Sequence, residues 1–292
     1  MIRFLKHLCL MLASLCCADA LWAAECSDPK PFRFAVIPKK NVQAQLSEYR
    51  PLIALMEQAL GRRIELVRTS SYGAVIEGLL AGSIDLAELG PASYASAKTR
   101  DPGITAFAST TQPQGPYTDS SLYYRSILVV RQHKGLDSLA ALRGASVSLI
   151  DPDSTSGALL PRDAMAQLTG MPLERYFGRV TFAGSHDRAI QAVQKGLVDA
   201  AFVASLRLDE ALRQGSLHAD ELAVAWQSAP IPHDPFVYRG VLCPKLVSQL
   251  NKVFFEKDAA LQSMFRSLGI GGFVRVSDDN YRDIRDLFAR QP

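Results

Sequence analysis

The sequence predicts an α/β protein of two similar lobes, each with a mainly parallel sheet flanked by helices. Its 292 residues, 48% of them hydrophobic, are enough to bury two cores. Segments with strand and helix periodicity alternate along most of the chain, which is typical of parallel sheets. One helix–strand unit also occurs twice. The net charge of +3, with no block of Lys or Arg, does not favour nucleic-acid binding.

The first set of elements alternates strand and helix, over residues 32–37, 49–60, 64–67, 72–80 and 84–89. The first helix carries Pro51 in its first turn and Gly61 directly after its end, and Gly82 follows the second helix. These signals indicate true helix boundaries. The alternation predicts one parallel sheet covered by helices.

A second set repeats this order. It follows an extended segment over 122–131 and a short helix over 139–144, and it spans residues 145–150, 159–168, 179–183, 187–195 and 198–203. Residues 72–87 align without gaps on residues 186–201, so that 186 lies 114 after 72 and 199 lies 114 after 85. Any two helix–strand units share some features. Here, however, the glycine that ends the helix, the apolar positions of the helix and the strand that follows all match. Tyr72 and His186 therefore start equivalent helices in opposite lobes and are expected to face the cleft.

Three hydroxyl side chains stand between a strand and a helix of the second set. The segment is Asp-Pro-Asp-Ser-Thr-Ser-Gly over residues 151–157, and the hydroxyls belong to Ser154, Thr155 and Ser156. A helix N-terminus offers backbone N–H groups and the positive end of the helix dipole, so it favours an anion. The alternative is that one of the three merely caps the helix.

A second connection between the lobes is predicted near the end of the chain. Residues 230–235 contain three prolines, which exclude a helix, and residues 236–239 are extended. Helices over 244–255, 258–268 and 278–289 finish the chain. Asp234 lies between two of these prolines, Pro232 and Pro235, where it either caps a turn or presents a rigidly held carboxylate to the cleft.

The amino terminus has the layout of a secretory signal peptide over residues 1–24. Arg3 and Lys6 precede an apolar run that is too short to span a membrane, and small residues follow it. Export would leave Cys26 and Cys243 in an oxidising compartment, where they either pair or remain two free thiols. No Cys/His cluster with metal-ligand spacing is present, so we expect neither a metal nor a cofactor.

Several of these segments together resemble the PhnD-like phosphate, phosphite and phosphonate-binding proteins of ABC importers. The resemblance covers essentially the whole mature chain, and its motifs are specific in this order and spacing. They lie at residues 72–94, 124–126, 154–157, 184–187 and 232–239.

The resemblance implies a two-lobed type II periplasmic binding protein fold joined by two crossing strands. Lobe 1 would comprise residues 25–125 and 237–292, and lobe 2 residues 126–236. The protein would be a soluble periplasmic monomer, not an enzyme, that captures a phosphorus oxyanion and delivers it to an ABC permease. The oxyanion would be held by the side chains of Tyr72, Tyr124, Ser154, Thr155, Ser156, His186 and Asp234.

Two departures from the family pattern concern the ligand's substituent. Relatives that take aminoalkylphosphonates carry a further acid about twenty residues after the His, where this chain has Ala-Ser-Leu-Arg over 204–207. An ammonium group therefore has one fewer partner here, which weakens the case for 2-aminoethylphosphonate. Lys39, Lys40 and Glu88 also depart from the pattern, without a role that the sequence indicates.

Two other functions remain open on sequence grounds. The same lobes could serve a sensor for a similar anion or an importer of another class. An exported hydrolase would use Ser154 or Ser156 with His186 and Asp187, but the chain has no G-x-S-x-G motif. Binding without chemistry is the interpretation that the sequence favours.

Overall fold

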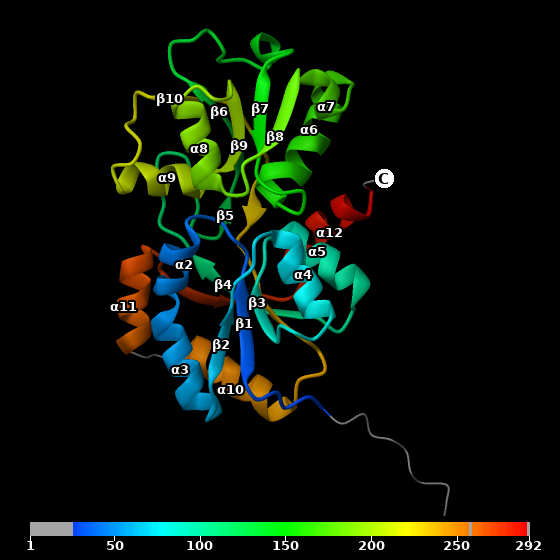
Figure 1. Ribbon diagram of the computed structural model, residues 1–292, viewed down its shortest axis with the longest axis vertical. Coiled ribbons are helices and arrows are strands. Elements are labelled where there is room, and N and C mark those ends of the chain that lie inside the picture. Colours follow the sequence, from blue (N-terminus) through cyan, green and yellow to red (C-terminus); the bar gives the residue numbers. More distant parts are fainter. Residues whose placement is uncertain (1–25, 257–258, 291–292) are drawn as a thin grey trace, which may run out of the picture.

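The computed structural model describes residues 26–256 and 259–290, which form two α/β lobes (Figure 1). The predicted signal peptide, residues 1–24, lies outside the described residues. Within the described part of the chain, no helix has both the length and the apolar character needed to cross a membrane.

Lobe 1 is built on a six-stranded sheet in the order β13-β4-β12-β3-β1-β2. Strand β1 pairs in parallel with β2 and β3, whereas β12 runs antiparallel to β3 and β4. The strands are β1 (Phe32–Val36), β2 (Ile64–Val67), β3 (Leu86–Glu88), β4 (Thr105–Thr111), β12 (Phe236–Tyr238) and β13 (Gly272–Arg275).

Helices cover both faces of this sheet. They are α2 (Val42–Glu48), α3 (Arg50–Leu60), α4 (Tyr72–Leu80), α5 (Pro91–Arg100), α10 (Pro244–Phe255), α11 (Ala259–Leu268) and, after a 3-10 turn at Asp278–Tyr281, α12 (Arg282–Ala289). Gly61 ends α3 with a φ of 60°, a left-handed conformation that glycine adopts without strain. On the other side of the sheet from α4, Phe254 packs on Phe236 and Phe273, with ring centroids 5.0 and 4.6 Å apart. This aromatic contact holds the returning chain in lobe 1.

Lobe 2 contains a five-stranded sheet in the order β10-β6-β9-β7-β8. Its strands are β6 (Ser126–Arg131), β7 (Ser146–Leu149), β8 (Arg179–Phe182), β9 (Ala200–Ala204) and β10 (Leu222–Gln227). Its helical segments are a 3-10 turn (Ala140–Leu142), a π-helical turn (Thr155–Leu159), α6 (Leu160–Thr169), α7 (Leu173–Tyr176), α8 (His186–Gln194) and α9 (Ser205–Arg213). The helix predicted from residue 159 thus begins at residue 155, because the hydroxyl residues form its first turn.

Apart from the edge strand β13, the sheet of lobe 1 has the same topology as the sheet of lobe 2. In lobe 2, β7 pairs in parallel with β8 and β9, and β6 runs antiparallel to β9 and β10, as β12 does to β3 and β4 in lobe 1. The duplicated unit seen in the sequence is α4 with β3 and α8 with β9. Residue 186 lies 114 after 72 and residue 194 lies 114 after 80, so α4 and α8 match at both ends. The repeat therefore reflects two similar lobes.

Two short strands connect the lobes. Strand β5 (Tyr123–Tyr124) pairs antiparallel with β11 (Ile231–Pro232). The extended segment predicted over 122–131 is therefore wrong as a single strand. It divides at Arg125, whose side chain turns away to bond Asp119 and the Ser228 carbonyl. The break lets β5 belong to the connection and β6 to lobe 2.

A disulfide joins Cys26 to Cys243, which are 217 residues apart in the sequence. The backbone supports the link, because Ser27 N donates to the Val241 carbonyl and Cys243 N donates to the Ser27 carbonyl. Both cysteines lie in lobe 1, and Cys243 precedes α10 directly. The bond therefore fastens the start of the described chain to the segment that returns from lobe 2.

We expect the Cys26→Ser, Cys243→Ser double variant to lose about 2 to 5 kcal/mol of unfolding free energy, because the disulfide closes a long loop in the unfolded chain. Chemical denaturation with and without reductant measures the loss. Ligand affinity should not change, because both cysteines lie within one lobe. An unfolding midpoint equal to that of the oxidised wild type would contradict this account.

Candidate functional site

All seven side chains predicted to bind the ligand line one cavity between the lobes. The cavity has an empty volume of about 300 Å³. Its wall is completed by Ile37, Lys39, Gly90, Ala204, Leu206 and Arg207. The structure therefore brings together residues that are as many as 162 positions apart, since the range runs from Tyr72 to Asp234.

Five helices begin at this cavity. Tyr72 is the first residue of α4, His186 is the first residue of α8, and Ser154 caps the π turn that continues into α6. The other two are α5 and α9, whose capping residues are Gly90 and Ala204. Each helix directs the positive end of its dipole at the same small space. Their sum favours an anion without adding a formal positive charge.

Two of the three hydroxyls in the first turn of the π segment already accept a backbone hydrogen bond. Gly157 N donates to Ser154 Oγ at 3.1 Å, so Ser154 is indeed the N-cap. Ala92 N of lobe 1 donates to Thr155 Oγ1 at 2.8 Å. A hydroxyl has one proton to donate and two lone pairs, so each can still donate its O–H, either to a ligand or to the adjacent phenols of Tyr72 and Tyr124. Capping and anion binding are therefore compatible at these residues.

Tyr72 and Tyr124 contribute two further uncharged donors. Burial raises the pKa of both phenols well above the usual value, and Asp234 acts in the same direction. Tyr124 is held in place by stacking on His233, with the rings 5.5 Å apart and nearly parallel. Tyr72 is fixed by its position at the start of α4, where its backbone N–H bonds Asp151 Oδ2. Both therefore remain protonated at any physiological pH.

His186 is a neutral donor rather than a base. Ala204 N donates to His186 Nδ1 at 3.2 Å, so the ring proton is carried by Nε2. Burial, reinforced by Arg207 and Lys39, lowers the pKa of His186 to about 3. An imidazole protonated at Nε2, with Nδ1 already accepting a hydrogen bond, has no lone pair for a serine proton. The arrangement is therefore unlike the Ser–His–Asp triad of hydrolases, in which Nδ1–H donates to the acid.

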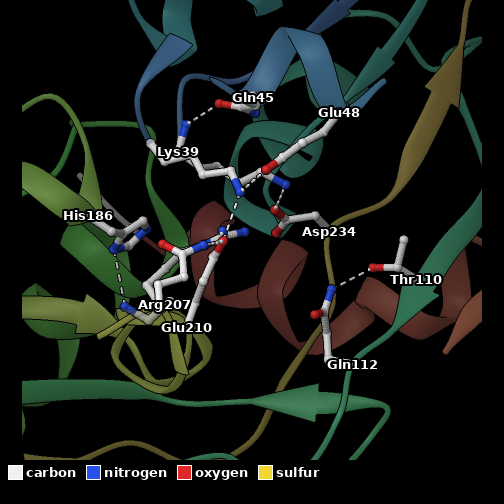
Figure 2. Close-up of polar contacts among 12 residues, drawn as sticks. Lys39, Gln45, Glu48, Thr110, Gln112, His186, Arg207, Glu210 and Asp234 are labelled. Atoms are coloured by element: carbon white, nitrogen blue, oxygen red, sulfur yellow. Dashed lines mark hydrogen bonds and ion pairs between the residues drawn. The ribbon is translucent and has the colours of Figure 1, made fainter. Parts of the chain in front are cut away.

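Asp234 is paired within the protein. Lys39 Nζ donates to Asp234 Oδ2 at 3.0 Å (Figure 2). It also donates to Glu88 Oε1 at 2.7 Å. Burial alone would lower the pKa of Lys39, but Glu88 and Asp234 outweigh it and raise the pKa above its usual value. The Asp234 backbone carbonyl also accepts from Ser109 Oγ. Of the two alternatives predicted for Asp234, a turn cap or a carboxylate held at the cleft, the structure shows the second. Lys39 compensates its charge.

Lys39 and Arg207 are the wall residues whose role the sequence did not reveal. Gln45 of α2 fixes the Lys39 segment, because its side chain bonds both Lys39 N and the Ile37 carbonyl. Arg207 lies in the first turn of α9 and pairs with Glu210 at 2.5 Å. A signal for Arg207 was present in the sequence: the repeat offset of 114 makes Arg207 of lobe 2 the equivalent of Ser93 of lobe 1. Within the described ranges, no cluster of His, Cys, Asp and Glu side chains is arranged to hold a metal ion.

The lobes contact each other directly around the cavity. Ser93 Oγ donates to the Asp153 carbonyl at 2.9 Å, and His186 N donates to the Lys39 carbonyl at 3.2 Å. Lys40 Nζ bridges the lobes by binding both Glu48 (2.7 Å) and Glu210 (2.8 Å). With the bonds from Tyr72 and Ala92, these contacts close the cleft over the site.

Two known binding proteins have related sequences. The chain is 29% identical over 261 residues to the phosphate-import protein PhnD of Mycolicibacterium smegmatis, covering 86% of this chain and 79% of that one. It is 28% identical over 264 residues to the phosphonates-binding periplasmic protein of Escherichia coli, covering 88% and 76%.

Two solved structures have similar folds. A binding protein component of an ABC phosphonate transporter from Pseudomonas aeruginosa superposes with a TM-score of 0.79 at 25% identity, covering 88% of this chain and 84% of that one. PhnD1 of Prochlorococcus marinus in complex with methylphosphonate gives 0.76 at 18% identity, covering 89% and 97%. Residues 34–281 match the family described as "ABC transporter, phosphonate, periplasmic substrate-binding protein". The chain therefore belongs to the family of periplasmic substrate-binding proteins of phosphonate ABC transporters, with its two-lobed type II fold.

Proposed function

We propose that this protein captures a phosphorus oxyanion (phosphonate, phosphite or phosphate) in the cavity between its lobes and delivers it to an ABC permease. The observation that carries the proposal is the convergence of five helix N-termini with uncharged hydroxyl and imidazole donors on one buried cavity. Such donors replace the hydration water of an anion and hold it by hydrogen bonds, and the anion can still dissociate.

The proposed cycle needs only opening and closing of the lobes. Lobe 1, residues 25–125 and 237–292, and lobe 2, residues 126–236, would hinge at the paired connections β5 and β11. The ligand would favour the closed state because it contacts donors from both lobes at once. The protein would act as a monomer in the periplasm, exported by the segment over residues 1–24, and would perform no chemistry on the ligand.

A thermal-shift panel tests the function directly. At least one of phosphate, phosphite, methylphosphonate and 2-aminoethylphosphonate should raise the melting temperature, since a ligand that binds only the folded state stabilises it. Sulfate and ethanesulfonate are the matched tetrahedral controls. A shift with the sulfur anions alone, or with none of the six, would refute the proposal.

Replacing Ser154 by Ala should weaken oxyanion binding by roughly 1 to 3 kcal/mol, because one hydrogen bond to a charged group is lost. Isothermal titration calorimetry with the best ligand of the panel measures the change.

The Ser71→Ala variant is the control for Ser154→Ala. Ser71 caps α4 by accepting from Ala74 N at 3.2 Å, as Ser154 caps its own segment, but it does not line the cavity. It should reduce stability by about 1 kcal/mol and leave affinity unchanged. Equal losses of affinity in both variants would mean that Ser154 acts only as a cap.

The His186 ring should stay neutral, with its proton on Nε2, down to about pH 4, because the pKa of His186 is lowered to about 3. In the unfolded chain the same group titrates near 6.5, so its contribution to stability is complete above 6.5 and decreases as the pH falls from 6.5 toward 3. Long-range ¹H–¹⁵N spectra of the imidazole report charge and tautomer. An imidazolium signal for His186 at pH 5 would contradict this assignment.

A further inference from the structure

The cations on the cavity wall are already paired with carboxylates of the protein, Lys39 with Glu88 and Asp234, and Arg207 with Glu210. Among the residues that the structure describes there, two carry positive charge, Lys39 and Arg207, and one carries negative charge, Asp234. His186 is neutral for the reasons given above. Asp234 is therefore the wall carboxylate that a positively charged ligand substituent would need.

The ammonium group of Lys39 already lies against Asp234, where such a substituent would have to bind. The ammonium nitrogen is 3.0 Å from Asp234 Oδ2 (Figure 2). It also lies 2.7 Å from Glu88 Oε1, and it is buried with both carboxylates. Glu88 also accepts a hydrogen bond from the Tyr49 hydroxyl, so the cluster is held from several sides. A ligand ammonium that approached Asp234 would meet Lys39, with Arg207 as a second like charge.

Lys39 and Arg207 also limit the size of the substituent. A second cavity adjoins the first, and the two share Lys39, Leu206 and Arg207 as lining residues. These three side chains therefore form the wall between the cavities. A substituent that extends from the first cavity toward the second would contact them.

We propose that Lys39 is the specificity-determining residue of the site, a built-in ammonium that compensates Asp234 and so selects tetrahedral phosphorus oxyanions whose fourth substituent is small and uncharged over aminoalkylphosphonates. The proposal rests on the proposed function and narrows its ligand to anions such as phosphite, phosphate or methylphosphonate. A cationic substituent is disfavoured because close juxtaposition of like charges in a buried site opposes binding.

Calorimetry with matched ligands tests this selection. The comparison uses phosphite, methylphosphonate, 2-aminoethylphosphonate and propylphosphonate, in which a methyl group replaces the ammonium of 2-aminoethylphosphonate at nearly equal size. The wild type should bind phosphite or methylphosphonate at least about tenfold more tightly than 2-aminoethylphosphonate, and the Lys39→Met variant should improve 2-aminoethylphosphonate relative to propylphosphonate by about tenfold or more.

Lys40→Met is the matched control. The ammonium of Lys40 also lies between two carboxylates, Glu48 and Glu210, but Lys40 does not line the oxyanion cavity. It should leave the ratio of the two affinities unchanged. The Lys39→Met, Glu88→Gln double variant removes one charge of each sign from the buried cluster. It should therefore fold even if the Lys39→Met single variant does not. It should give the same change in preference between 2-aminoethylphosphonate and propylphosphonate.

Two results would overturn the inference alone. One is a wild type that binds 2-aminoethylphosphonate as tightly as methylphosphonate, and the other is a folded Lys39 variant with an unchanged ratio of affinities for 2-aminoethylphosphonate and propylphosphonate. Both leave the proposed function intact, since a phosphorus oxyanion still binds. Failure of every phosphorus oxyanion, inorganic phosphate included, would instead refute the proposed function and this inference with it.

Discussion

The convergence of helix N-termini on one cavity is the constraint that the rest of the structure serves. An anion enclosed between two lobes loses its water, so the protein must replace those hydrogen bonds and supply a favourable potential. Helices α4, α5, α6, α8 and α9 provide that potential because each follows a strand whose carboxyl end meets the cleft. Repeating one strand–helix–strand–helix unit in both lobes brings the helix ends to the anion from opposite sides.

The second requirement is that the buried charges compensate each other. Several first-turn N–H groups are already bonded across the cleft, among them those of Tyr72, Ala92 and His186. The donors that line the cavity are thus mainly the hydroxyls and the imidazole. Beside them, Lys39 joins Asp234 to Glu88 and Lys40 joins Glu48 to Glu210. Removal of one side chain from such an ion pair would leave an unpaired buried charge. The loss of folding free energy would then exceed what the pair itself contributes.

The fold and much of the candidate site could be predicted from the sequence. The duplicated unit placed Tyr72 and His186 at equivalent helix starts, and the hydroxyl triplet lies where its chemistry suggested. Helix α5 was not predicted, because its buried face is made of Ala, Ser and Pro rather than large apolar side chains, so no stripe was visible. Strand β4, Thr-Ala-Phe-Ala-Ser-Thr-Thr, was missed for the same reason.

The roles of Lys39 and Arg207 could not be predicted. Lys39 depends on partners far away in the chain, whereas Arg207 pairs with the nearby Glu210 and lines the cavity only because the lobes meet there. Lys39 is 195 positions from Asp234, and nothing near Lys39 in the sequence indicates that pair. Local patterns report caps, stripes and turns, which is why the helix starts were found. Ion pairs between lobes depend on how the lobes meet, which only the folded chain establishes.

The depth of the cavity has a consequence for any membrane protein that receives this one. Tyr72, Tyr124 and the residues from Ser154 to Ser156 are all nearly inaccessible to solvent with the lobes in contact. A ligand at that depth would present no atom at the protein surface. A permease that receives the protein would detect a bound ligand only through the surface of the closed lobes. It would need to recognise the ligand itself only after the lobes open.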